Sequence, residues 1–301
     1  MDSVTTEMVE ADASVAVPPK KMSMPVRTAL GLGAGGVAVL MMVVDATWPA
    51  GFVYAAAGVA ATALALADVA RLATGAGIRT NRSMIVQAGA ILFLLQWAGW
   101  AAPGTFPNPW FGAAIVLAAA VAGTLTARVL RGDIPGAIES AGATALALVY
   151  IPLLLGFLTG VRIGWGVSGL FTVLAVCKFG SSGAYFFGSW LGRRKLAPNV
   201  SPRKTVVGAF GEVGTGMLVA WLLAISPLRL MDVLPSLAFG ALVSGAAMVG
   251  DLTASLLKRQ AGVKDSGQLL PGIGGMLDMM DGVLFAAPVA YFVLLWCGTA
   301  G

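Results

Sequence analysis

Histidine is absent from this chain, and charged residues make up only 11% of it. The absence of histidine removes the usual general base near neutral pH and the commonest metal ligand in proteins. Any bound metal must then be held by oxygen ligands, which suits a hard ion such as Mg²⁺. Cys177 and Cys297, the two cysteines, both lie in apolar runs, so neither a disulfide framework nor a zinc site is expected.

The scarcity of charge also limits the fold class. A soluble globular protein carries roughly 25% charged residues, whereas 58% of this chain is hydrophobic. Apolar surface on this scale suits a bilayer rather than water. Spans of about 20 residues predict an all-α, polytopic integral membrane protein with about nine transmembrane helices. We expect them near residues 28–45, 49–70, 84–102, 109–129, 137–158, 164–190, 205–226, 233–257 and 280–298.

Three regions follow from this pattern. Residues 1–24 are polar and are expected to form a disordered tail, too acidic at its start to be a signal peptide. Residues 25–160 are expected to form N-terminal membrane helices. Residues 161–301 are expected to form a C-terminal membrane domain with a polar site facing the cytoplasm.

The connections between the predicted spans alternate between a basic set and a set with little charge. The second set holds little charge beyond Arg162 and Arg229. The positive-inside rule places the basic set in the cytoplasm, with the N-terminus inside and the C-terminus outside. The net charge of +5 therefore reports topology rather than nucleic-acid binding. The basic set comprises Lys20, Lys21, Arg27, Arg71, Arg79, Arg82, Arg128, Arg131, Arg193, Arg194, Lys195, Arg203, Lys204, Lys258, Arg259 and Lys264.

One segment near the C-terminus concentrates the polar residues. After Asp232 the chain has only four more acidic residues, and all of them lie in residues 250–281 together with three cations. Charges at a bilayer are costly and usually face a polar cavity. The residues of this cluster are Asp251, Lys258, Arg259, Lys264, Asp265, Asp278 and Asp281.

The spacing within this segment favours two helix ends around a break. Asp251, Ser255 and Lys258 recur at i, i+4 and i+7, and so share one helix face. Asp278 and Asp281 are i and i+3 at the start of the last span, while residues 271–275 interrupt the helix. Convergent carboxylates and cations suit Mg²⁺–nucleotide chemistry. On these residues alone, a solvated loop with helix-end anchors stays an alternative.

The segment resembles the signature of CDP-diacylglycerol synthases (phosphatidate cytidylyltransferases). A second stretch, residues 183–205, is similar to the Gly-Ala-Tyr and Ile-Ser-Pro-Lys-Lys-Thr region of that family, so the resemblance covers roughly residues 180–285. Departures from the family pattern are Ser181 for Asp, Val207 for Glu, Ile273 for His and Met279 for Arg. The matching signature residues are Ser255, Lys258, Arg259, Lys264, Asp265, Pro271, Gly272, Gly274, Gly275, Asp278 and Asp281.

The resemblance implies an enzyme that transfers CMP from CTP to phosphatidate, with Mg²⁺ as cofactor, at a cytoplasmic site in the cell (inner) membrane. The lipid bilayer is its expected surroundings and nucleic acid is not a partner, while monomer and homodimer both stay open. The resemblance assigns Asp265, Asp278 and Lys264 to catalysis; Ser201, Arg203, Lys204, Tyr185, Ser255, Lys258 and Arg259 to substrate binding; and Asp251, Asp265, Asp278 and Asp281 to the metal.

Alternatives remain at this level. The lipid phosphate could instead be a polyprenyl or ether lipid, and a transporter could also carry polar residues among its spans. We see no internal repeat of the kind common in transporters, and the polar residues crowd to the cytoplasmic side. We also expect Asp68 and Arg71 to form a local ion pair, and Lys178 either to snorkel or to contact a phosphate.

Overall fold

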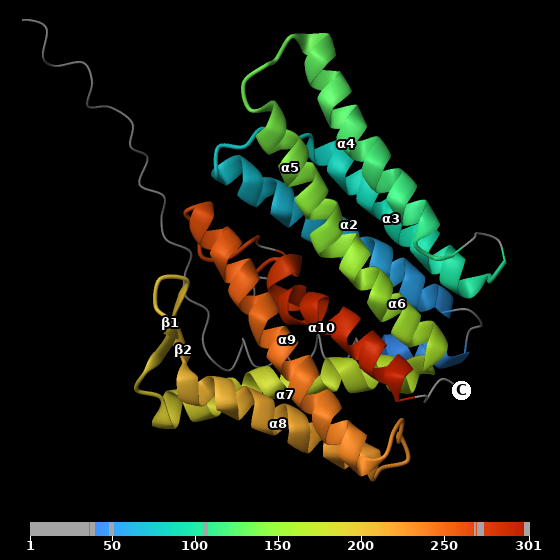
Figure 1. Cartoon of the computed structure of the whole chain (residues 1–301), viewed down its shortest axis with the longest axis vertical. Helices are drawn as coiled ribbons and strands as arrows, with labels where there is room; N and C mark the ends of the chain where they lie inside the picture. The colour runs from blue at the N-terminus through green and yellow to red at the C-terminus, as the bar shows by residue number, and fades with distance from the viewer. Residues whose placement is uncertain are drawn as a thin grey trace, which may run out of the picture.

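The computed structural model describes residues 36, 40–47, 51–104, 108–267, 269 and 274–297. Long helices dominate these residues (Figure 1). A π-helical turn joins two of the helices into one continuous span, Ala137–Gly164. The elements are α2 (Phe52–Gly75), α3 (Arg82–Ala101), α4 (Phe111–Arg131), α5 (Ala137–Leu148), η2 (Val149–Leu153), α6 (Leu154–Gly164), α7 (Gly166–Leu191), β1 (Lys195–Ala197), β2 (Ser201–Thr205), α8 (Val206–Ala224), α9 (Val233–Gln260) and α10 (Met276–Trp296).

The predicted membrane fold is confirmed. In the described part of the chain, 8 helices are long and apolar enough to cross a membrane. They match the predicted spans from 49–70 onward. The first predicted span, 28–45, lies largely outside the described residues, although residues 40–47 are helical. The predicted tail, 1–24, lies wholly outside them, and the division into 25–160 and 161–301 stays a prediction.

Local sequence explains where several helices begin and end. The Asn81 side chain caps α3 by accepting a hydrogen bond from the Met84 N–H at 3.2 Å. Thr205 caps α8 in the same way through the Gly208 N–H at 3.1 Å. Gly132 ends α4 at φ +64°, a left-handed conformation that glycine adopts without steric cost.

Small residues let the C-terminal helices pack closely. α7, α8 and α9 lie side by side, and α10 packs against α9 and α6 (Figure 1). A Cβ atom at Gly240 of α9 would lie 2.5 Å from the carbonyl oxygen of Gly216 in α8, so no larger residue fits there. Close backbone approach of this kind drives helix association in membranes. The buried core contains Phe239 of α9 and Leu284 of α10.

A short hairpin interrupts the helices, and the sequence did not predict it. β1 and β2 pair antiparallel, with Lys195 opposite Thr205 and Ala197 opposite Ser201. The strands have 3 and 5 residues, too short to give a periodic hydrophobic pattern. The hairpin nevertheless fixes Lys204 immediately before α8, close to the C-terminal half of α9.

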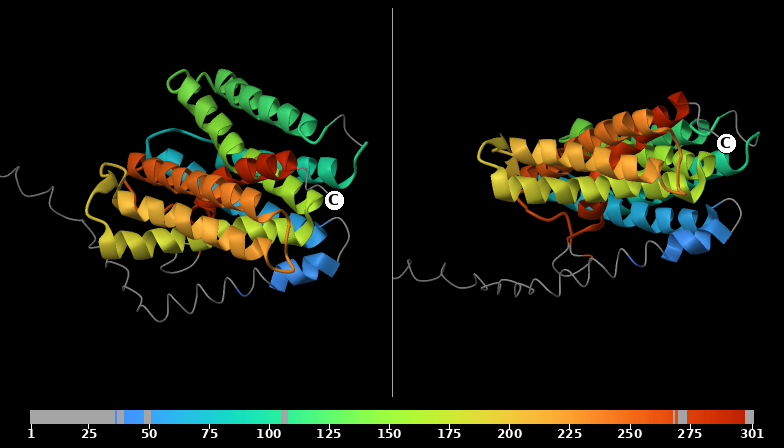
Figure 2. Two further views of the ribbon diagram at one scale, coloured as in Figure 1. Left: turned by 60° about the horizontal axis from the view of Figure 1, so that its bottom comes forward. Right: turned by 90° about the horizontal axis from the view of Figure 1, so that it is seen from below.

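The described basic connections gather at one end of the bundle, which we call the basic end. Arg79, after α2, pairs with Asp133, after α4, at 3.7 Å. The Arg71 side chain at the end of α2 donates to the Ser266 carbonyl in the α9–α10 loop at 3.4 Å. Arg259 of α9 donates to the hairpin carbonyl of Val200 at 3.4 Å. The hairpin and the end of α10 lie at opposite ends of the bundle (Figure 2).

Candidate active site

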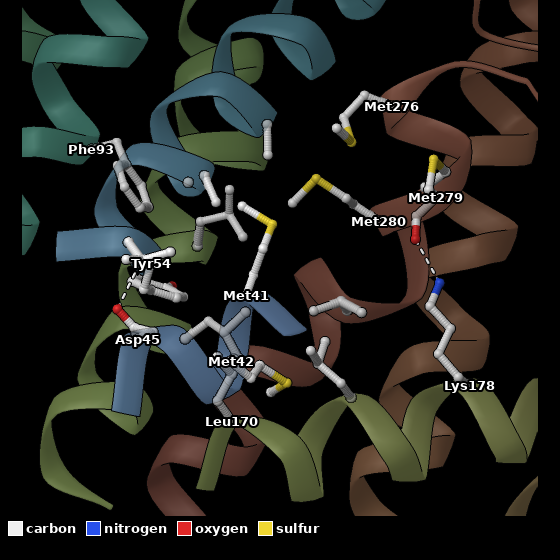
Figure 3. A pocket seen from close by; sticks show the side chains of 18 residues that line it. Met41, Met42, Asp45, Tyr54, Phe93, Leu170, Lys178, Met276, Met279 and Met280 are labelled. Carbon is white, nitrogen blue, oxygen red and sulfur yellow. Dashed lines mark hydrogen bonds between the residues drawn. The ribbon is translucent and has the colours of Figure 1, made fainter. Parts of the chain in front are cut away.

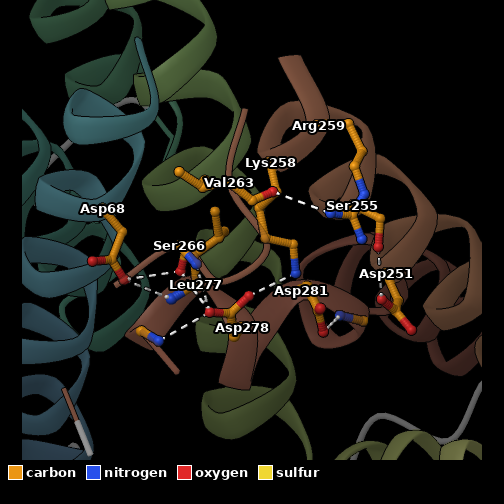
Figure 4. Close-up of polar contacts among 12 residues, drawn as sticks. Asp68, Asp251, Ser255, Lys258, Arg259, Val263, Ser266, Leu277, Asp278 and Asp281 are labelled. Atoms are coloured by element: carbon orange, nitrogen blue, oxygen red, sulfur yellow. Dashed lines mark hydrogen bonds and ion pairs between the residues drawn. The ribbon is translucent and has the colours of Figure 1, made fainter. Parts of the chain in front are cut away.

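The site lies at the basic end, where three segments meet (Figure 4). The C-terminal half of α9 carries Asp251, Ser255 and Lys258, and the start of α10 carries Asp278 and Asp281. The loop between these helices turns back across their ends. This matches the predicted arrangement of a helix end, a break and a helix start.

Asp278 fastens the loop to both helices. Its Oδ1 atom accepts from Lys258 Nζ at 2.6 Å, and both side chains are nearly buried. Its Oδ2 atom accepts from the Ser266 N–H at 2.8 Å, the Ser266 Oγ–H at 2.9 Å and the Gly275 N–H at 2.9 Å. A carboxylate at this position also offsets the positive end of the helix dipole. Both oxygens of Asp278 are therefore already engaged in building the loop.

Asp68 joins this network from α2, far away in the sequence. Its Oδ2 atom accepts from the Leu277 N–H at 3.2 Å and from Ser266 Oγ at 3.3 Å. The predicted ion pair with Arg71 is confirmed at 3.4 Å. The spacing of the two residues predicted the ion pair but not the contacts with the loop. The signal for them was a carboxylate placed in an otherwise apolar span, which usually has a partner in another element.

Asp251 and Asp281 face a second part of the site. Asp251 pairs with Lys204 of β2 at 2.8 Å. Ser255 donates to Asp251 at 3.5 Å, and the Gly282 N–H donates to Asp281 at 2.7 Å. The ion pairs of the described residues include none with Asp281. Asp281 therefore has an oxygen free for a ligand and lies within electrostatic range of Asp251.

One buried carboxylate beside this pair was missed by the sequence reasoning. Glu212 of α8 is 3% exposed and lies within electrostatic range of Lys204, Asp251 and Asp281. Gly250 permits the close approach of α9 and α10, because a Cβ atom there would lie 2.3 Å from the Asp281 carbonyl oxygen. Asp251, Asp281 and Glu212 thus bring three carboxylates close together, with Lys204, Lys178 and Lys258 as the cations within electrostatic range.

The described residues contain no group of three or more histidine, cysteine or acidic side chains placed to hold a metal ion. The four carboxylates predicted for the metal are therefore not assembled as one cluster here. Mg²⁺ commonly uses one or two protein carboxylates plus water and substrate phosphates. Asp281, which has a free oxygen, and Asp251, whose Oδ2 atom pairs with Lys204, can supply two such ligands, whereas Lys258 and the loop engage both oxygens of Asp278.

The other predicted site residues lie on the loop, the hairpin, α7 and α9. Lys264 and Asp265 are exposed in the loop, directly before the Ser266 N–H that binds Asp278. Arg203 is exposed on β2, where Ser201 is half-buried. Tyr185 is 68% exposed on α7 and packs against Phe186. Arg259 is exposed and donates to the Val263 carbonyl at 3.3 Å. Ile273, together with Pro271 and Gly272, lies outside the described residues.

An apolar cavity of about 300 Å³ lies behind the site (Figure 3). It is bounded by residues 41–45, α2, α3, α6, α7 and α10, and methionines are prominent in its lining. Lys178 of α7 lies at its edge and donates to the Met279 carbonyl at 2.6 Å. The cavity extends from the first turns of α10 away from the basic end. The methionines that line it are Met41, Met42, Met276, Met279 and Met280.

The chain matches a known protein family and several known proteins. The cytidylyltransferase family profile matches residues 26–297. The chain is 37% identical over 180 residues to a protein of Escherichia coli K12 called uncharacterized protein YnbB, covering 57% of this chain and 59% of that protein. It is 43% identical over 132 residues to the phosphatidate cytidylyltransferase of Synechocystis, covering 42% of this chain and 43% of the relative. The phosphatidate cytidylyltransferase of Thermotoga maritima is 35% identical over 178 residues, covering 58% of this chain and 66% of the relative. Each match thus spans less than two thirds of the relative's own length.

Proposed function

Because this chain belongs to the cytidylyltransferase family, we propose that it transfers CMP from CTP to phosphatidate, forming CDP-diacylglycerol and releasing pyrophosphate. The observation that carries this proposal is the site at the basic end, where carboxylates of α9 and α10, among them Asp281 with a free oxygen, lie with Lys204 and Lys258 beside an apolar cavity. Two of the relatives that match the chain are called phosphatidate cytidylyltransferases.

The reaction needs positioning and charge neutralisation more than proton transfer. An oxygen of the lipid phosphate forms a bond to the α-phosphorus of CTP. The bond from that phosphorus to the β-phosphate oxygen breaks, and pyrophosphate leaves with the electron pair. A phosphate is already anionic at neutral pH, so a chain without histidine can perform this step.

The residues divide this task between them. Asp251 and Asp281 would hold Mg²⁺, which would supply neutralisation of the charge that develops on the reacting phosphates. Lys204, Arg203 and Lys264 bind the phosphates of the nucleotide and the lipid. Asp278 and Lys258 hold the loop in place. These roles for Asp278 and Lys258 differ from those predicted from the sequence. They rest on the ion pair between the two side chains.

The experiment that tests this proposal uses the purified full chain with Mg²⁺ and one nucleotide and one lipid at a time. We expect pyrophosphate release with CTP and phosphatidate, but not with ATP, GTP or UTP. Equal or faster release with a polyprenyl phosphate or an ether-linked phosphatidate would assign the same chemistry to another lipid. No release with any pair would contradict the proposal and favour a transporter.

We propose that the basic end faces the cytoplasm, where CTP is present, in agreement with the positive-inside rule. In a variant with Cys177 and Cys297 replaced by serine, single cysteines would be placed at Asn199 and Gln260. An impermeant maleimide added to intact cells should label neither. A cysteine at Pro227, between α8 and α9, is the matched control and should be labelled. Labelling of positions 199 and 260 with protection of 227 would reverse the orientation.

We propose that the apolar cavity receives an acyl chain of the lipid substrate. Ala61 lines the cavity, whereas its neighbour Ala60 is exposed on the outer face of α2. Ala61→Phe should lower kcat/KM for dipalmitoyl phosphatidate by about tenfold. The added ring would fill space that the acyl chain needs, and losing the contacts of one methylene in an apolar pocket is enough for an effect of that size. Turnover of dihexanoyl phosphatidate should change little. Ala60→Phe should affect neither substrate, and an equal loss with both chain lengths in Ala61→Phe would contradict this role.

A further inference from the structure

Tyr150 reaches the site from the N-terminal half of the chain. It lies in η2, the π-helical turn Val149–Leu153, which contains Pro152. Such turns change the direction of the side chains that follow and are frequent at functional sites. The Tyr150 side chain is 4% exposed, and its ring packs edge-on against Phe285 of α10 with centroids 6.0 Å apart. Phe285 is one helical turn beyond Asp281.

The hydroxyl group of Tyr150 is buried and has no hydrogen-bond partner among the described residues. A buried donor without a hydrogen-bond partner lowers stability by about 1–3 kcal/mol, so such groups normally have a partner. The Tyr150 side chain lies within electrostatic range of both Asp251 and Asp281. The hydroxyl is not bonded to either carboxylate, so its hydrogen-bonding capacity stays available to another group.

Resting on the function proposed above, we propose that the Tyr150 hydroxyl donates a hydrogen bond to a phosphate oxygen of the substrate bound beside Asp251 and Asp281. A phosphate oxygen accepts a hydrogen bond from a neutral donor, which adds no charge to a site that already holds several carboxylates and lysines. The donor is presented by a rigid, packed aromatic ring and therefore loses little entropy on binding. The hydroxyl thus serves as a substrate-positioning group outside the residues that resemble the family signature.

The test compares Tyr150→Phe with Tyr291→Phe, a matched control on α10 that lies in an aromatic cluster away from the carboxylates. Tyr150→Phe removes only the hydroxyl. Without substrate its Tm should equal or exceed that of the wild type, because no protein hydrogen bond is lost. Its kcat/KM should fall about 10- to 100-fold, as expected for a hydrogen bond to a charged group. Tyr291→Phe should change neither quantity.

The kinetic constants identify which phosphate is bound. A rise in KM confined to phosphatidate assigns the lipid phosphate, and one confined to CTP assigns the nucleotide. The increase in Tm on adding phosphatidate micelles, or CTP with Mg²⁺, gives a readout that does not need turnover. If the wild type releases no pyrophosphate, the proposed function fails, while loss of either thermal shift in Tyr150→Phe still supports the phosphate contact. Unchanged kinetics and thermal shifts, or a lower Tm without substrate, would overturn this role.

Discussion

Asp281→Asn is expected to remove CMP transfer while leaving the fold intact. Asp281 has an oxygen free of protein contacts and lies beside Asp251, so it is the side chain best placed to hold a cation. A neutral amide is a poor ligand for Mg²⁺, and losing one anionic ligand should lower the rate by roughly 10²-fold or more. The Tm without substrate should stay close to that of the wild type, because Asp281 makes no ion pair within the described part of the chain.

Asp232→Asn is the matched control for this prediction. Asp232 lies at the opposite end of the bundle, where it is largely exposed and pairs with Arg229. It should keep normal turnover, because exposed ion pairs contribute little to stability and this one is far from the site. A rise in Tm on adding Mg²⁺ should appear in the wild type and in Asp232→Asn but not in Asp281→Asn. Normal turnover in Asp281→Asn would show that the carboxylate is a helix-end anchor.

Asp278→Asn is expected to act through stability. Asp278 and Lys258 form an ion pair in which each side chain is only about a tenth exposed. Removing one partner of such a pair leaves an uncompensated charge and typically costs about 3–5 kcal/mol. Asp278→Asn should therefore lower the Tm and speed hydrogen exchange at the Ser266 and Gly275 amides, which donate hydrogen bonds to the carboxylate in the wild type.

The double variant Asp278→Asn with Lys258→Met separates the ion pair from the loop contacts. It removes both charges, so its Tm should lie above that of Asp278→Asn alone. Its activity should stay low, because the loop donors still lack one acceptor oxygen. A wild-type Tm for Asp278→Asn would contradict the anchoring role and return this residue to the predicted metal ligands.

Hydropathy predicted most of the fold because each span is a local property of the chain. The spans from 49–70 onward correspond to observed helices, and their ends fall near the basic residues that marked the connections. The hairpin was missed because strands of 3 and 5 residues carry no usable periodicity. Its contribution to the site is Lys204, which the resemblance had nonetheless assigned to substrate binding.

The site was predicted in part, and its limits have a physical cause. Spacing along the chain identified Asp251, Asp278 and Asp281, because those residues lie on neighbouring turns of two helices that meet. It could not distinguish a carboxylate saturated by loop donors, as in Asp278, from one with a free oxygen, as in Asp281. Asp68 and Tyr150 are separated from these residues by more than a hundred positions, so only tertiary packing reveals their contacts.

Following the α-phosphate of CTP distinguishes CMP transfer from the alternatives. The purified full chain would be incubated with Mg²⁺, phosphatidate micelles and CTP labelled at either the α- or the γ-phosphate, followed by organic extraction. We expect that the α-label enters the lipid phase and that the γ-label stays in the aqueous phase as pyrophosphate. With Asp281→Asn, neither label should enter the lipid phase. An α-label that stays in the aqueous phase with every lipid phosphate tested, or equal transfer by Asp281→Asn, would contradict these expectations.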